Sequence, residues 1–125
     1  MLFDTDIIIW IQRGNKKAAD LVDSDNDRSI SIITYMELLQ NAKNKQQQIL
    51  IKNYLNEMDF TILSISENIG HRALVYIEEY SLSNGISADD ALIAATAIEN
   101  NQMLISGNHK HYKAIHELIF KRFQS

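Results

Sequence analysis

The sequence predicts an α/β fold, a three-layer α/β/α domain built on a mostly parallel sheet of about four or five strands. Short apolar runs alternate along the chain with longer segments in which apolar residues recur at helical spacing. Strands that alternate with helices form right-handed βαβ units, which place helices on both faces of a parallel sheet. The 125 residues suit one domain, residues 1–125, since domains commonly contain about 100 to 200 residues.

The individual elements follow from local patterns of apolar residues, caps and glycines. The predicted strands are residues 1–4, 28–33, 60–65, 103–105 and a short run near 118–120. The predicted helices are residues 6–13, 16–23, a segment beginning at 34, and residues 46–58, 66–83 and 89–100. Gly14 and Gly85 end two of these helices, and the helix from residue 89 is apolar almost all round, which indicates burial on several sides.

Composition excludes several classes of function. There is no cysteine, so the chain has neither disulfides nor a thiolate nucleophile, and any metal must be held by oxygen or imidazole. The apolar runs are far shorter than the roughly 20 residues that cross a bilayer, and acids stand near the N-terminus where a signal peptide carries positive charge. We therefore expect a cytoplasmic protein with no membrane contact. The net charge of -4 restricts any nucleic-acid contact to a local basic surface.

Four carboxylates stand where predicted strands give way to helices. Asp4 ends the first strand, Glu37 follows the second, and Asp89 and Asp90 head the most apolar helix. Ligands of parallel sheets bind at the carboxyl ends of the strands, where such junctions converge. Several acids gathered at one sheet edge repel one another, and a divalent cation is the natural compensation. The pattern indicates a metal site.

Helix capping offers a simpler explanation for some of these acids. Thr34 with Glu37, and Ser87 with Asp90, fit the capping-box pattern of a hydroxyl followed three residues later by an acid. For either acid taken alone, capping is the commoner reason for its position. Asp4 is different, because a carboxylate that ends a central strand loses its hydration. Thr5 or Asp6 can cap the next helix without it.

A site of carboxylates suits hydrolysis that needs no nucleophilic side chain. Magnesium prefers oxygen ligands and is commonly held by one or two carboxylates together with phosphate oxygens of a substrate. Bound divalent ions activate water and neutralise charge on a phosphoryl group. The chain has no Gly-x-Ser-x-Gly motif and no phosphate-binding Gly-Lys-Ser/Thr loop, which excludes the common serine-hydrolase and nucleotide-loop alternatives.

Four segments, in order along nearly the whole chain, resemble the motifs of PIN-domain ribonucleases of the VapC toxin type. They are Phe3-Asp-Thr-Asp-Ile-Ile-Ile9, Ser31-Ile-Ile-Thr-Tyr-Met-Glu-Leu-Leu39, Asp90-Ala-Leu-Ile-Ala-Ala-Thr-Ala97 and Leu104-Ile-Ser-Gly-Asn-His-Lys-His-Tyr112. The third of these is the most specific. The resemblance implies a PIN-like fold and a Mg²⁺- or Mn²⁺-dependent endoribonuclease that acts as the toxin of a type II toxin-antitoxin pair.

The resemblance also implies the site residues. Asp4, Glu37 and Asp90 match the acidic, metal-binding and catalytic positions of the family, and Asp89 is a neighbour of the site. The last motif departs from the family pattern Thr-x-Asn-x-x-Asp-Phe, since His111 stands in the place of the fourth acid. The number of metal ions therefore stays open. So do the contributions of Asp89, His111 and two further polar residues, which are Ser106 and Asn108.

The implied partners are an RNA substrate, a VapB-type antitoxin and a second copy of the chain. The antitoxin is expected to dock against residues 34–58 and to insert a basic side chain among the acids, in a heterotetramer or a larger assembly. Basic residues near the C-terminus are expected to attract the RNA strand, and Trp10 is a candidate for base stacking or for packing. Two alternatives stay open: a non-catalytic PIN-like module that binds protein, and a receiver-like magnesium-binding signalling domain.

Overall fold

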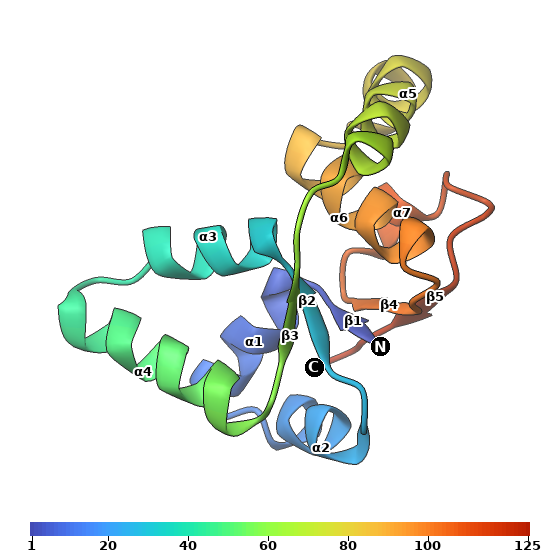
Figure 1. Cartoon of the computed structure of the whole chain (residues 1–125). Coiled ribbons are helices and arrows are strands. Elements are labelled where there is room, and N and C mark those ends of the chain that lie inside the picture. The colour runs from blue at the N-terminus through green and yellow to red at the C-terminus, as the bar shows by residue number, and fades with distance from the viewer.

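The computed structural model describes all residues from Met1 to Ser125 and contains one five-stranded sheet with helices on both faces (Figure 1). The strands are β1 (Leu2–Phe3), β2 (Ser29–Ser31), β3 (Thr61–Leu63), β4 (Leu104–Ser106) and β5 (Phe120–Arg122). The helices are α1 (Thr5–Gln12), α2 (Lys16–Ser24), α3 (Ile32–Gln40), α4 (Lys45–Glu57), α5 (Glu67–Asn84), α6 (Ala88–Glu99) and α7 (His109–Tyr112). The predicted three-layer α/β/α architecture is confirmed.

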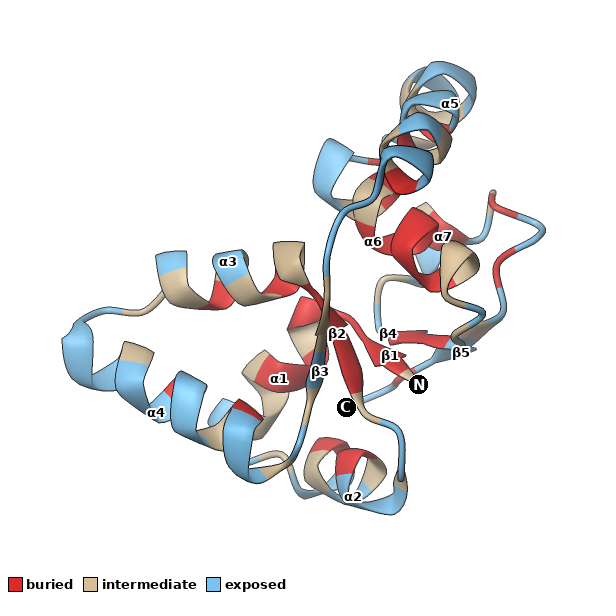
Figure 2. Ribbon diagram, in the orientation of Figure 1, coloured by how far each residue is buried: buried red, intermediate tan, exposed pale blue.

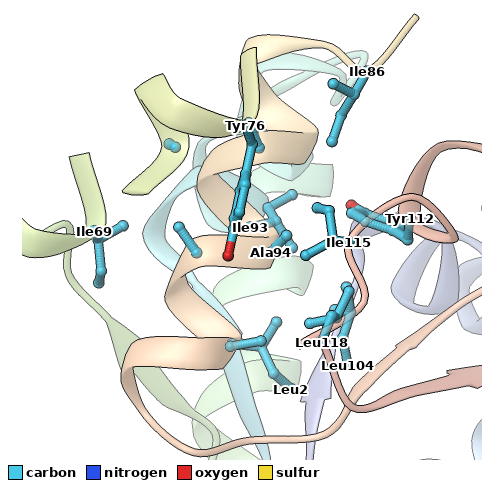
Figure 3. Packing of buried hydrophobic residues seen from close by; sticks show 14 residues of the cluster. Leu2, Ile69, Tyr76, Ile86, Ile93, Ala94, Leu104, Tyr112, Ile115 and Leu118 are labelled. Atoms are coloured by element: carbon cyan, nitrogen blue, oxygen red, sulfur yellow. The ribbon is translucent and has the colours of Figure 1, made fainter. Parts of the chain in front are cut away.

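The two faces of the sheet support separate apolar cores. Neighbouring residues of one strand point to opposite faces, so Leu2 belongs to one core and Phe3 to the other. The first core joins the sheet to α5, α6 and the segment after α7, and Figure 3 shows Tyr112 and Ile115 packed toward Ile93 of α6. The second core joins it to α1, α2 and α4. Figure 2 shows the central strands buried between these layers.

The order of the strands fixes where a ligand can bind. All neighbouring strands are parallel, and their order is β3-β2-β1-β4-β5. The chain thus winds outward from β1 in one direction and from β4 in the other. The crevice at the carboxyl ends of β1 and β4 is the topological switch point, where ligands of open parallel sheets bind. Asp4 follows β1 at this point, and Ser106 ends β4.

Two predicted strand boundaries and one predicted strand-to-helix junction are corrected by the structure. The second strand was expected to reach residue 33, but it ends at Ser31, whose hydroxyl caps α3 by accepting from the backbone of Ile33. The last strand begins at Phe120 and extends to Arg122, two residues beyond its predicted place. Helix α6 follows α5 directly and does not follow a strand. Local propensity could not place these ends, because parallel pairing with a neighbour decides them.

Helices α3 and α4 form the expected hairpin, which projects to one side of the sheet (Figure 1). The outer faces of α4 and α5 are largely exposed (Figure 2). None of the helices combines the length and the apolar character required to cross a membrane.

Candidate functional site

Asp4 occupies the centre of the switch point and is almost fully buried, with 6% of its surface exposed. It is itself the N-cap of α1, because one carboxylate oxygen accepts from the backbone of Thr5 at 2.8 Å. The other oxygen accepts from the hydroxyls of Ser106, at 2.7 Å, and Tyr112, at 3.0 Å. Two segments more than 100 residues away along the chain therefore hold this carboxylate in place.

Asp90 lies on the opposite side of the Tyr112 hydroxyl. That hydroxyl is 3.4 Å from one oxygen of Asp90, while the other oxygen lies 3.0 Å from Nδ1 of His111 and 3.4 Å from the side-chain amide of Asn108. The backbone amide of Asn108 donates to Ser106, so the last motif connects both acids. Tyr112 is therefore common to the surroundings of the two carboxylates.

Glu37 reaches the same edge from α3 through a threonine pair. The hydroxyl of Thr5 donates to Glu37 at 2.6 Å and lies 3.1 Å from the hydroxyl of Thr34. Both threonines are buried, which fixes the rotamer of the glutamate. Burial is the main cause of the raised pKa of Glu37, and the charge of the exposed Asp89 raises it further. Adjacent residues of a helix differ by about 100° in direction, so Asp89 faces Glu37 while Asp90 faces Tyr112.

The capping explanation is wrong for Glu37 and incomplete for Asp90. Thr34 lies inside α3 and the cap is Ser31, so Glu37 falls in the second turn, where no orphan amide needs it. Ser87 does cap α6 by accepting from the backbone of Asp90. The carboxylate of Asp90 makes no reciprocal bond to Ser87 and turns to Tyr112 and His111 instead.

Asp6 also belongs to this site, although sequence reasoning considered it only as a cap. It lies in the first turn of α1, and one oxygen accepts from the backbone of Gly107 at 2.8 Å. The other oxygen is buried without a hydrogen-bond partner. The approach is close, since a Cβ at Gly107 would lie 2.9 Å from this carboxylate and would force the Asp6 side chain to move. The spacing Asp4-Thr-Asp6 at a strand end was the signal that could have identified it.

The electrostatics of the site are those of crowded anions. Burial, followed by the charge of Asp6, raises the pKa of Asp4 to about 7. Burial is also the largest cause that raises the pKa values of Asp6 and Glu37. No lysine or arginine pairs with any of these acids, and the imidazole of His111 is the only basic group in contact with them. Negative charge is concentrated here without a compensating cation.

These residues fit a hard divalent cation. All the donors are oxygens, and one carboxylate oxygen, in Asp6, lacks a protein partner although it is buried. No three His, Asp or Glu side chains are arranged so that they could hold a metal ion by themselves. Magnesium does not require one, because it keeps several waters and is usually held by one or two carboxylates. Asp4 and Asp90, on either side of one hydroxyl, would provide that pair.

Comparison with protein families assigns the chain. Residues 1–117 match the model of the PIN domain, which covers the whole sheet except β5 together with every acid described above. The chain belongs to the PIN domain family. PIN domains are generally nucleases that use divalent metal ions, which agrees with an oxygen-rich site at the switch point. No curated protein matches the chain.

Solved structures of PIN-type toxin complexes are similar over nearly the whole chain. A chain of a toxin-antitoxin complex from Klebsiella pneumoniae has 31% identity and a TM-score of 0.79, with 94% of this chain and 93% of that chain covered. A chain of VapBC-1 from nontypeable Haemophilus influenzae has 28% identity and a TM-score of 0.77, with 97% and 96% covered. A chain of VapBC2 from Rickettsia felis, bound to a DNA fragment from the promoter, has 26% identity and a TM-score of 0.78, with 98% of both chains covered. The PIN domain thus resembles VapC-type toxins.

The raised pKa of Asp4 predicts how the metal-free PIN domain responds to pH. The folded protein binds this proton more tightly than the unfolded chain, so stability is lost as pH rises from about 4 to about 7. The difference between the ordinary pKa of 3.8 and the folded-state pKa of about 7 corresponds to at most about 4 kcal/mol in the free energy of unfolding. Asp4→Asn should therefore unfold at higher urea concentration than wild type at pH 8, and similarly to it near pH 4.

Urea titrations in EDTA at several pH values, followed by Trp10 fluorescence, measure this difference. Asp23→Asn, an exposed aspartate far from the site, should leave the profile unchanged. If the difference in unfolding free energy between Asp4→Asn and wild type stays constant with pH, burial does not raise the pKa of Asp4.

Proposed function

We propose that residues 1–125 form a single PIN domain that acts as a Mg²⁺- or Mn²⁺-dependent endoribonuclease, the toxin of a VapBC-type pair. The observation that carries this proposal is the convergence of Asp4, Glu37 and Asp90 on the switch point with no cation to neutralise them. The similarity to chains of toxin-antitoxin and VapBC complexes supports the role as a toxin. RNA as substrate and the cytoplasm as the place of action rest on the resemblance of the sequence motifs to VapC-type ribonucleases.

In this proposal the three acids divide two roles between them. Asp4 and Asp90 hold the metal, and the hydroxyl of Tyr112 sets the distance between them. Glu37 binds the metal or orients the attacking water, and its raised pKa makes it a better proton acceptor than an exposed glutamate. Thr5 occupies only one of the two carboxylate oxygens of Glu37. A bound divalent ion would supply charge neutralisation at the phosphoryl oxygens.

Ser106 and His111 act on the acids and not on the substrate. Ser106 donates to Asp4 and fixes the direction of its lone pairs. His111, when Nδ1 carries its proton, donates to Asp90 in the manner of residues that orient metal-binding carboxylates. These contacts provide the preorganised geometry that hydrolysis of a phosphodiester requires.

Isosteric removal of one acid at a time tests the catalytic roles. Asp4→Asn, Asp90→Asn and Glu37→Gln should each reduce metal-dependent cleavage of single-stranded RNA by about 100-fold or more, the scale on which one preorganised group contributes. Expression of each variant in cells should inhibit growth less than expression of the wild-type protein, because less RNA is cleaved. Cleavage sites mapped on total RNA would also show which RNA is the target.

The matched controls are Glu67→Gln and Asp23→Asn, which remove exposed acids away from the site. Both should cleave RNA and inhibit growth like wild type. Wild-type cleavage by folded Asp4→Asn would overturn the assignment of this site.

A non-catalytic PIN-like module that binds protein is the second candidate, favoured by His111 in the place of an acid. Calorimetric titration with Mn²⁺ separates the two. A metal site should give a saturable isotherm in wild type that is lost in Asp4→Asn and Asp90→Asn, and metal binding should raise the melting temperature. Acids retained only as caps would bind no Mn²⁺ in any of these proteins.

The receiver-like alternative finds no support. It requires an aspartate at the end of the third strand, and β3 ends at Leu63 followed by Ser64. It also requires a lysine at the end of the fifth strand, whereas β5 carries Lys121 one residue before its end at Arg122. Incubation with a small phosphodonor should leave the chain unmodified.

The proposed antitoxin would dock on the α3–α4 hairpin. Met36 and Leu50 are 51% and 66% exposed on this hairpin. A mostly apolar groove of about 450 Å³ between α1 and α4 includes Ile11, Leu50 and Tyr54 among its lining residues. Similarity to chains of toxin-antitoxin complexes supports this assignment. A basic side chain of the antitoxin, inserted among the acids, would supply the missing cation and inhibit the enzyme.

Leu50→Asp tests this docking surface. The change adds charge to an exposed position, so the fold should persist while an apolar partner helix is repelled. The tagged variant should fail to co-purify the product of the adjacent reading frame, and RNA cleavage should remain. Ile119→Asp, at a position that is 60% exposed and lies outside both the hairpin and α5, provides the control. Equal recovery of the partner with Leu50→Asp would place the antitoxin elsewhere.

The second copy of the chain would use a different surface. Helix α5 exposes Leu74, Val75 and Leu82, which makes it the candidate for homodimerisation. With the hairpin occupied by an antitoxin, such a dimer gives a heterotetramer, and DNA binding by the antitoxin would extend it further.

A further inference from the structure

An open groove of about 550 Å³ begins beside the acids and passes over the carboxyl end of β5. Asp6, Gly107 and Asn108 line its inner end, next to the proposed metal site. Trp10 of α1 and Arg122 of β5 line its outer part. We call this the Trp10 groove. It is the only large hollow that starts at the acids and contains both an aromatic ring and a cation.

The outer part of the groove carries one cationic side chain, Arg122. Arg122 also lines a second groove, of about 450 Å³, in which Lys17 and Lys121 outnumber Asp20. None of these three cations forms an ion pair, and the ammonium of Lys17 donates to the backbone carbonyl of Gln124 at 2.9 Å. The two adjoining hollows thus share one arginine and have basic residues on either side of β5, which suits a chain of phosphates that passes across this strand.

Trp10 is held in place before any ligand arrives. Its ring packs partly against the core that contains Ile7 and Phe3, and the guanidinium of Arg13 lies 5.8 Å from the ring centroid. The remaining surface of the ring lines the groove. A base that stacks on a fixed ring loses little additional side-chain entropy, and Arg13 adds a further unpaired positive charge at this end.

The register of the sheet places Arg122, on β5, one strand away from β4, which ends beside the acids. Arg122 pairs with Ser106 across β4 and β5, and Ser106 in turn donates to Asp4. A phosphate bound at Arg122 therefore lies beside the strand end that orients the central carboxylate. The spacing suits a nucleotide adjacent to the bond that is cut.

We propose that the Trp10 groove binds single-stranded RNA, with one base stacked on Trp10 and a neighbouring phosphate at Arg122. This inference rests on the proposed ribonuclease function and names the site for a flanking nucleotide. Only unpaired RNA fits, because the bases of a duplex are already stacked on each other and cannot reach an isolated ring. Stacking tolerates every base, so the groove contributes affinity and direction to the strand more than sequence preference.

The chain has a single tryptophan, so Trp10 fluorescence reports on its own site. The experiment titrates a mixed-sequence single-stranded RNA 12-mer into Asp4→Asn protein in EDTA, where no cleavage occurs. Binding should quench the fluorescence to saturation, and a duplex of the same sequence should quench it weakly. No quenching by the single strand would overturn the proposal, and quenching by an added antitoxin alone would assign the groove to protein.

Variants then separate stacking from charge, with affinity measured by anisotropy of labelled RNA. Trp10→Leu should weaken binding about ten-fold, and Trp10→Phe should retain most of the affinity because phenylalanine still stacks. Arg122→Ala should weaken binding and reduce the salt dependence by about 0.7 in the logarithmic slope, the value for one phosphate on a single strand. Lys52→Ala, an exposed lysine on α4 outside the groove, is the matched control.

The outcomes keep this inference apart from the ribonuclease proposal. If Trp10→Leu and Arg122→Ala both bind RNA with wild-type affinity while the native enzyme cleaves RNA, the groove is not the RNA site, but the ribonuclease proposal stands. If RNA quenches Trp10 fluorescence and both variants bind RNA more weakly, but the native protein shows no metal-dependent cleavage, the groove binds RNA and the ribonuclease proposal is wrong. Melting temperatures confirm that each variant is folded, and Arg122→Ala changes only an exposed side chain.

Discussion

The buried carboxylate of Asp4, placed where the sheet reverses its direction of winding, is the constraint on which the rest of the site depends. It ends β1, caps α1, and accepts hydroxyl bonds from β4 and from α7. Strand order alone brings these segments together, because the carboxyl ends of β1 and β4 are adjacent only at the switch point. Asp90 is linked to this carboxylate through the Tyr112 hydroxyl, while Thr5 and Gly107, which adjoin Asp4 and Ser106 in sequence, hold Glu37 and Asp6.

This arrangement stores unfavourable electrostatic energy that a ligand can release. Asp4, Asp6 and Glu37 all have raised pKa values, chiefly because burial removes water from their charged forms. Structural ion pairs lower the pKa of an acid, so these groups are not satisfied by the protein itself. Under the proposed function, the same imbalance would favour both a divalent ion and a basic side chain of an antitoxin. One buried site would then serve both catalysis and inhibition.

The fold could be predicted from the sequence because its signals are local. Alternating apolar runs and helical stripes identified the five strands and the main helices, and a cap such as Ser87 marked α6. The details of the site depend on contacts between distant residues. The bond from Tyr112 to Asp4 joins positions 108 residues apart, and the bond from Gly107 to Asp6 joins positions 101 apart. No periodicity encodes such pairs, so Tyr112 and Asp6 were not identified as site residues.

His111 and Asp6 place different side chains on the two proposed parts of the site. An acid in the place of His111 would face Asp90 directly, whereas the imidazole lies 3.0 Å from that carboxylate and can donate to it when Nδ1 carries its proton. The carboxylate of Asp6 accepts from the backbone of Gly107 and lines the inner end of the Trp10 groove. In the proposed RNA site a strand would therefore meet Arg122 in the outer part of the groove and Asp6 at its inner end, where a bound metal ion would compensate the charge of the acids.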